Sequence, residues 1–314
     1  YTITYTWDIT KTVVPASLEL LEGDTAEVTY TVAVNKDAGT PGSFAVAGAI
    51  VVENPAPMTA TVGLADVMSQ VGAVGTSCGS VTEVGPDSLK SCTYAVALDS
   101  AATRTNVVTA TLAGKSYVAD VTIDFSVAVT TEVLPSVTVT DSYAGAGQPW
   151  GFGTSGTAIY MRTLGCTEAS GYSNGSKRTE YDNTVRIVQT GDEDDATAVV
   201  DCFRPLVSKD ATPSFTRTYS WEITKTVTPE SVTLFDGETA NVTYTVSVAP
   251  SYADSAFRVA GTVAITNPAP FTMTLNVADV LGNGAAASFT NCTNPVAVGP
   301  ESSVSCAYAA APGA

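Results

Sequence analysis

Two lysines stand inside stretches of the sequence that are otherwise apolar and β-branched. Lys11 lies in WDITKTVVP, and Lys225 lies in the nearly identical WEITKTVTP. Side chains alternate between the two faces of a β-strand, so Lys11 shares its face with Trp7 and Ile9. Burial disfavours the charged form of a lysine, and a neutral amine is a nucleophile. The pattern therefore predicts a reactive amine on a core-facing strand position.

An acid and an amide in the same part of the chain have the same strand parity. Asp66 shares its face with Leu64, and Asn106 shares its face with Val108. If all three polar groups enter one core, the Asp66 carboxyl can polarise the Asn106 amide while the Lys11 amine attacks it and ammonia leaves. We therefore predict an intramolecular isopeptide bond between Lys11 and Asn106, with Asp66 as the catalytic acid.

A simpler alternative gives the lysine a purely structural place. In it, the Lys11 stem lies along Trp7 and the ammonium reaches the rim of the fold, on Asp66 or a backbone carbonyl. The second copy of the pattern has crosslink candidates in Lys225 and Asp279, but no asparagine follows at the expected position. The two interpretations differ by the mass of one ammonia in the intact protein.

These residues belong to a repeated segment of the chain. ENPAPMTATVGLADV returns as TNPAPFTMTLNVADV, and VGPDSLKSCTYA returns as VGPESSVSCAYA, at an offset of 213 or 214 residues. Between the copies, short alternating strands are separated by Gly, Pro, Asp and Ser clusters, which is typical of β-sandwiches. We predict an all-β chain of tandem immunoglobulin-like sandwiches: a repeat at 1–125, a smaller sandwich at 126–208, and the repeat again at 209–314 without its last strands.

The six cysteines follow the repeat. Two cysteines of the first copy recur in the second copy at the same spacing, so each copy is expected to close its own bridge. A zinc site is not expected, because the chain has no histidine and no CxxC motif. The predicted disulfides are Cys78–Cys92, Cys166–Cys202 and Cys292–Cys306.

Composition excludes several classes of function. Acidic residues outnumber basic ones 31 to 14, and the net charge of -17 opposes binding to nucleic acid or anionic lipid. The absence of histidine removes the commonest general base, and no catalytic or cofactor motif is present, so we expect neither an enzyme nor a cofactor. No apolar run has membrane-spanning length. Asn174, Asn241 and Asn291 begin N-glycosylation triplets and are candidate glycan sites.

Three segments of the first copy carry a family resemblance. Lys11 with TVVPASLELLEGDTAEVTYTVAV, then ENPAPMTATVGLADV, then RTNVVTATL, resemble the conserved-repeat sandwich of bacterial and archaeal surface proteins, known as domain of unknown function eleven. The resemblance covers roughly 1–112 and 215–314. It implies tandem immunoglobulin-like domains, export and a structural or adhesive role. The trio of Lys11, Asp66 and Asn106 is also similar in logic to the crosslinks of pilin-type Cna domains.

The cysteines and the acidic bias favour an extracellular, cell-surface location, since disulfides persist in oxidising compartments. Our first functional hypothesis is a structural protein, the repeat subunit of a fibre, sheath or surface layer that assembles with copies of itself, with strand complementation as one route. The alternative is the stalk of an adhesin that binds a foreign protein or glycan. Self-association distinguishes them, because a stalk is expected to remain monomeric.

Overall fold

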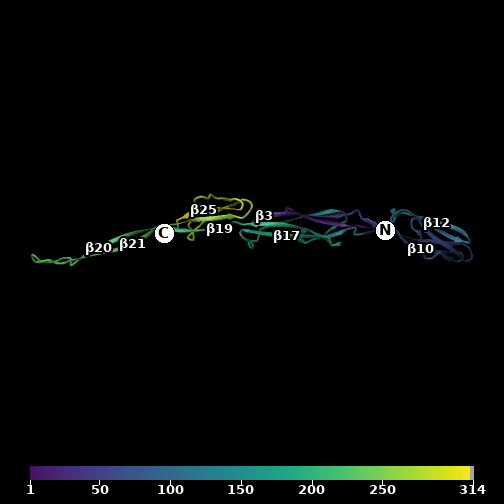
Figure 1. The fold of residues 1–314 in the computed structure, drawn as a ribbon, viewed down its shortest axis with the longest axis horizontal. Coiled ribbons are helices and arrows are strands. Elements are labelled where there is room, and N and C mark those ends of the chain that lie inside the picture. The colour runs from purple at the N-terminus through teal and green to yellow at the C-terminus, as the bar shows by residue number, and fades with distance from the viewer. Residues whose placement is uncertain (312–314) are drawn as a thin grey trace. The chain divides into compact units, whose positions relative to one another are not determined.

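The computed structural model describes residues 1–311, and nearly all of its regular structure is β-strand. Within those residues, helical turns occur only at Phe125–Val127 and Ala144–Ala146. The predicted all-β fold is therefore confirmed, whereas the tandem immunoglobulin-like arrangement stays a prediction. Figure 1 shows the strands and their order along the chain.

The chain divides into two compact units whose limits differ from the predicted boundaries at 125 and 208. The first unit contains residues 1–15, 28–162 and 182–197, and the second contains the rest of the described chain. Several long strands begin in one unit and end in the other. The chain passes between the units repeatedly, which a division into consecutive domains does not anticipate.

Two sheets, whose strands have residues of both units, form what we call the middle sandwich. The first sheet has the strand order β16–β4–β2. Its bounds are β2 Trp7–Val14, β4 Thr25–Lys36 and β16 Gly156–Gly165. The second sheet has the order β15–β14–β17–β18–β3. Its bounds are β3 Ser17–Leu21, β14 Val137–Asp141, β15 Trp150–Phe152, β17 Ser176–Ile187 and β18 Glu193–Phe203. Alternate residues of these strands are buried, as the apolar alternation of their sequences requires.

The strands β6 to β12 form a separate sandwich, which we call the first repeat sandwich. In the sequence, these strands lie between β4 and β14. One of its sheets pairs β6 (Ala45–Asn54) with β10 (Ser88–Ala97). The other has the order β12–β11–β7–β8, and β9 also pairs with β7. Its bounds are β7 Ala60–Met68, β8 Gly72–Ala73, β9 Val81–Val84, β11 Arg104–Leu112 and β12 Lys115–Ile123. The β10 and β12 labels in Figure 1 mark it.

Three short strands of the first unit form a further small sheet, in the order β13–β1–β5. Their bounds are β1 Thr2–Thr4, β5 Thr40–Gly42 and β13 Thr131–Val133. β1 runs parallel to β13 and antiparallel to β5. The sheet joins segments from both sides of the first repeat sandwich in the sequence.

The second unit contains the counterpart of the first repeat sandwich, which we call the second repeat sandwich. Its larger sheet pairs β21 with both β19 and β25, and β23 pairs with β25. β22 and β24 pair with each other. The bounds are β19 Leu206–Lys209, β21 Thr243–Asn267, β22 Met273–Leu275, β23 Ser288–Phe289, β24 Val296–Val298 and β25 Ser302–Ala310.

A long hairpin precedes that sandwich in the sequence. β20 (Thr212–Thr228) pairs antiparallel with the first part of β21. It repeats the sequence of the β2–β4 hairpin, with Trp221 in the place of Trp7. No helix within residues 1–311 has the length and apolar character needed to span a membrane.

All three predicted disulfides are confirmed. Each repeat sandwich closes its own bridge over a sequence separation of 14 residues, and the third bridge spans 36 residues. The pairs are Cys78–Cys92, Cys292–Cys306 and Cys166–Cys202. The repeat therefore determined the correct pairing among the 15 that six cysteines allow.

Candidate crosslinking site

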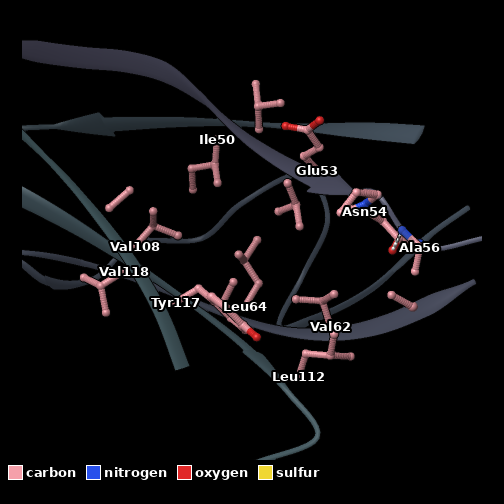
Figure 2. Close-up of a pocket in the computed structure, with 16 residues that line it drawn as sticks. Ile50, Glu53, Asn54, Ala56, Val62, Leu64, Val108, Leu112, Tyr117 and Val118 are labelled. Carbon is pink, nitrogen blue, oxygen red and sulfur yellow. Dashed lines mark hydrogen bonds between the residues drawn. The ribbon is translucent and has the colours of Figure 1, made fainter. Parts of the chain in front are cut away.

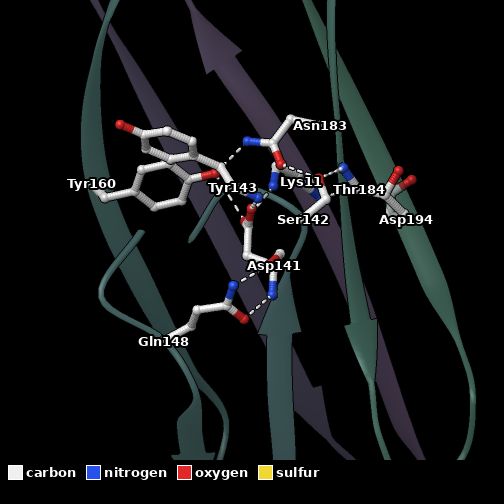
Figure 3. A network of polar contacts seen from close by, with 9 residues as sticks. All are labelled: Lys11, Asp141, Ser142, Tyr143, Gln148, Tyr160, Asn183, Thr184 and Asp194. Atoms are coloured by element: carbon white, nitrogen blue, oxygen red, sulfur yellow. Dashed lines mark hydrogen bonds and ion pairs between the residues drawn. The ribbon is translucent and has the colours of Figure 1, made fainter. Parts of the chain in front are cut away.

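Lys11 lies at the centre of the middle sandwich. It is in β2, and the apolar alternation of that strand turns its side chain into the interior, where none of the side-chain surface is exposed. The Lys11 Nζ atom forms an ion pair with the Asp141 Oδ2 atom of β14, whose side chain is equally buried. Figure 3 shows the two side chains meeting between strands of the two sheets.

Tyr160 and Asn183 extend the cluster. The Tyr160 hydroxyl donates a hydrogen bond of 2.8 Å to Asp141 Oδ2, and the Asn183 amide donates one of 2.5 Å to the Tyr160 oxygen. Ser142 Oγ donates to Asn183 Oδ1 at 2.8 Å, so both ends of the amide are held. An amine, a carboxyl and a carboxamide are thus linked through one phenol, deep in the sandwich (Figure 3).

The backbone fixes the acid and the lysine strand. Asp141 Oδ1 accepts a hydrogen bond of 2.8 Å from the Tyr143 backbone N–H, and Gln148 bonds both backbone groups of Asp141. The Lys11 backbone N–H donates to Asp194 Oδ2 at 2.6 Å. Asp194 lies in the acidic segment at the start of β18. A carboxylate of this segment therefore accepts a hydrogen bond from the backbone of β2, the strand that carries Lys11.

Burial decides the protonation chemistry of this cluster. Desolvation lowers the pKa of Lys11, and the hydrogen bond and charge of Asp141 offset only part of that effect. Desolvation, together with the hydrogen bond to Asp141, raises the pKa of Tyr160 well above its ordinary value. The Lys11 Nζ atom also lies 5.2 Å and 5.6 Å from the ring centroids of Tyr30 and Tyr160. Burial therefore makes the Lys11 ammonium easier to deprotonate, while the Tyr160 phenol keeps its proton.

The arrangement can support amide transfer. In an amide transfer within this cluster, the Lys11 amine attacks Cγ of the Asn183 carboxamide, and the proton that the amine loses is passed to the leaving nitrogen. One C–N bond forms to Lys11, one C–N bond of Asn183 breaks, and ammonia leaves. The same three residue types were expected from the sequence, with a different acid and a different amide.

The predicted partners of Lys11 lie in the first repeat sandwich. Asp66 in β7 faces Val108 in β11, and Asn106 stands opposite Met68, which makes Asp66 and Asn106 diagonal neighbours on the inward face. Lys11 forms its ion pair with Asp141 and not with Asp66, because β2 and β4 form a sheet with β16 and not with β6 to β12. All three side chains are nevertheless buried, as their positions along the strands predicted.

The second-copy candidates also lie apart. Lys225 is exposed in the β20–β21 hairpin, with its Nζ atom 4.4 Å from the ring centroid of Tyr244. Asp279 bonds to Lys209 Nζ at 2.5 Å, which is a lysine that the sequence analysis missed. In LVSK, Lys209 has the same strand parity as Val207, and this pattern could have identified it as a candidate partner for the acid.

Asp141 and Asn183 were missed for a similar reason. In SVTVTDSY, Asp141 has the parity of Val137 and Val139, and in NTVRIVQT Asn183 has the parity of Val185. Both patterns place a polar residue on a core-facing position, as in the strand of Lys11. Following strand parity through the middle segment finds both residues.

The three candidate glycan sites, Asn174, Asn241 and Asn291, are exposed, and glycosylation there stays a prediction. No protein-family model and no curated protein matches this chain. The resemblance to the surface-protein repeat family therefore also stays a prediction.

Proposed function

We propose that this protein is an extracellular structural protein, a repeat subunit of a cell-surface fibre, sheath or surface layer that assembles with copies of itself. The observation that carries the proposal is the contrast between two hairpins of nearly the same sequence. In the middle sandwich, the apolar face of the β2–β4 hairpin is buried. In the β20–β21 hairpin, the corresponding face is open.

The exposed fractions make the contrast quantitative. Trp7 is 4% exposed and its counterpart Trp221 is 63% exposed; Tyr30 is 0% exposed and its counterpart Tyr244 is 60% exposed. Ile223 is likewise open to solvent. Burial of each such large side chain contributes about 1.5–3 kcal/mol. Covering this face therefore makes the free energy of association more favourable by several kcal/mol.

A second copy of the chain is the partner that we propose for this face. The β2–β4 hairpin demonstrates that the sequence pattern is compatible with a covered state, and an uncovered apolar strand pair is prone to associate. Strand complementation, in which one molecule completes a sandwich of another, is the form of assembly that best uses such a face.

The buried lysine cluster suits the same role. An isopeptide bond between Lys11 and Asn183 joins β2 to β17 across 172 positions of sequence, and with the Cys166–Cys202 disulfide it fastens the middle sandwich covalently. Structural proteins that bear load need such links, since unfolding is then resisted by bonds and not only by packing. The three disulfides also favour an extracellular, oxidising location.

The function is tested by measuring self-association of the chain with light scattering after size exclusion, and by negative-stain microscopy. We expect concentration-dependent assembly that Trp221→Ser weakens strongly. The matched control is Glu222→Ser, which changes the neighbouring residue on the opposite face of β20 and leaves assembly intact. A chain that remains monomeric at all concentrations and binds a foreign ligand supports the adhesin stalk instead.

The crosslink is tested separately by intact mass under reducing conditions. The expected mass is that of the reduced chain less one ammonia. Lys11→Arg restores the full mass, whereas Lys225→Arg leaves the deficit unchanged. A full mass for the unmodified chain excludes the bond, and the lysine is then a buried ion-pair partner only.

A further inference from the structure

The first repeat sandwich has an open strand edge where the second repeat sandwich has a paired one. Within the described residues, β6 pairs only with β10. The matching part of β21 pairs with β25 on one side and with β19 on the other. Ile50 of β6 corresponds to Val263 of β21, which stands opposite Lys209. The first sandwich therefore lacks a neighbour at the position that β19 occupies in the second.

An apolar groove lies along this edge. It has a volume of about 480 Å³ and is lined by residues of β6, β7, β11 and β12, among them Val52, Leu64 and Tyr117 (Figure 2). Tyr117 is 60% exposed, although its strand parity matches that of core-facing residues. The groove thus has the walls of a sandwich core without the strand that would fill it.

In the second repeat sandwich, β19 borders the corresponding space. The residues that match Ile50, Val52, Val62 and Leu64 are Val263, Ile265, Leu275 and Val277. Together with Val207 and Lys209 of β19, these four residues line one cavity. An extended strand therefore pairs at this edge and presents an apolar residue and a lysine to the cavity, although Val207 itself is still 64% exposed.

Two buried polar groups of the first repeat sandwich have no partner. Asp66 and Asn106 are each 3% exposed, and neither Asp66 carboxylate oxygen nor Asn106 Oδ1 has a hydrogen bond among the described residues. The nearby cation of Arg104 is engaged by Asp99 and by carbonyl groups of its own loop. An unpaired buried carboxylate is costly, so a cation at this position is strongly favoured.

The second repeat sandwich also shows which cation meets this acid. Asp279, the counterpart of Asp66, bonds to Lys209 Nζ at 2.5 Å. The bond raises the pKa of Lys209, so that lysine is held as an ammonium ion. Transferred through the repeat, a lysine in the register of Lys209 stands opposite Ile50 and pairs with Asp66.

We propose that the free edge of β6 binds an extended, lysine-bearing strand of the Leu206–Lys209 type, whose ammonium pairs with Asp66. The strand adds to β6 as β19 adds to β21, and its apolar residues cover the groove. This site goes beyond the proposed function, because it lies in a different sandwich from the β20–β21 face and recognises a different chemistry.

The test uses the whole chain and a fluorescently labelled peptide with the sequence RPLVSKDAT, residues 204–212. Fluorescence anisotropy is expected to show saturable binding. Replacing the peptide lysine with methionine weakens binding by about tenfold or more, because it removes the partner of a buried charge. This comparison leaves the protein unchanged, so it does not depend on whether a variant chain folds.

Matched variants of the chain locate the site. Asp66→Asn is expected to weaken peptide binding as strongly as the peptide substitution does, and Asp279→Asn is expected to leave it unchanged. Absence of saturable binding overturns the proposal. Loss of binding with Asp279→Asn but not with Asp66→Asn also overturns it, because the peptide then exchanges with β19. Trp221→Ser leaves this binding intact, which separates the result from the self-association test.

Discussion

Lys11 and Lys225 occupy the same position of the repeat, within WDITKTV and WEITKTV, and yet their environments are opposite. Lys11 is buried against Asp141, and desolvation lowers its pKa. Lys225 lies on an exposed hairpin over the ring of Tyr244. The opposing sheet, and not the local sequence, decides whether the lysine at this position is buried.

The same lesson applies to the acids. Asp141 has its lysine, its phenol and its amide in one core, whereas Asp279 has a lysine that is 35% exposed and Asp66 has an amide neighbour but no lysine. The middle sandwich holds an acid, a lysine and an amide in one core, whereas the corresponding cluster of each repeat sandwich holds only two of these three groups among the described residues.

The largest expected difference between the two copies follows from removing the lysine. Lys11→Met leaves the Asp141 carboxylate buried without its partner, which costs about 3–5 kcal/mol of unfolding free energy. Lys225→Met changes an exposed side chain and is expected to cost less than about 0.5 kcal/mol. Urea unfolding followed by tryptophan fluorescence measures both, since Trp7 and Trp150 report on the middle sandwich. Equal effects contradict the comparison.

The disulfides extend the comparison to covalent links. Loop entropy predicts that the Cys166–Cys202 bridge, with a separation of 36 residues, stabilises the fold by about 4 kcal/mol, against about 3 kcal/mol for Cys78–Cys92, with a separation of 14. Replacing each pair with alanine and measuring thermal unfolding checks the order. A larger loss from the shorter loop shows that native-state strain, and not loop length, decides the effect.

The phenol of the cluster is expected to matter less than the lysine. Tyr160→Phe removes the donor to Asp141 and the acceptor for Asn183, and unpaired buried groups of this kind cost about 1–3 kcal/mol. Tyr252→Phe, in the exposed hairpin, is the matched control and is expected to have almost no effect. The urea midpoints of unfolding of the two variants measure this difference. A larger loss of stability in Tyr252→Phe than in Tyr160→Phe contradicts the prediction.

The smallest effect is the pH dependence that Lys11 confers as a free amine, in chains without the crosslink. Its pKa is lowered in the folded state, so the unfolded state binds more protons between that lowered value and the ordinary value of 10.5. Unfolding free energy therefore rises with pH through this window, by up to about 1.4 kcal/mol for each unit of lowering. The quantity to measure is the stability difference between the unmodified chain and Lys11→Met from pH 7 to 10. A difference that shrinks with rising pH contradicts a lowered pKa.

Strand parity and the repeat account for what the sequence analysis predicted correctly. Alternation placed Lys11, Asp66 and Asn106 inward, and the recurrence of Cys78 and Cys92 settled the disulfide pairing. Both are local properties, since side-chain direction and spacing are encoded within a few residues. They also made the all-β class predictable.

Partner choice could not be predicted in the same way. Lys11 meets Asp141 across 130 positions of sequence, with the whole first repeat sandwich between them. Parity states which residues enter a core but not which core they enter. We assigned Lys11 to Asp66 because both have core-facing parity within the predicted repeat at 1–125, and sheet pairing does not follow that boundary.

The insertion of one sandwich within another has a consequence during synthesis. The hairpin that carries Lys11 is complete by residue 36, but the strand that carries Asp141 emerges more than 100 residues later. At about 5–20 residues per second, that interval lasts several seconds at least. Throughout it, an apolar hairpin with a lysine at its centre has no opposing sheet, so we expect the nascent chain to need a chaperone that holds it until Asp141 has emerged.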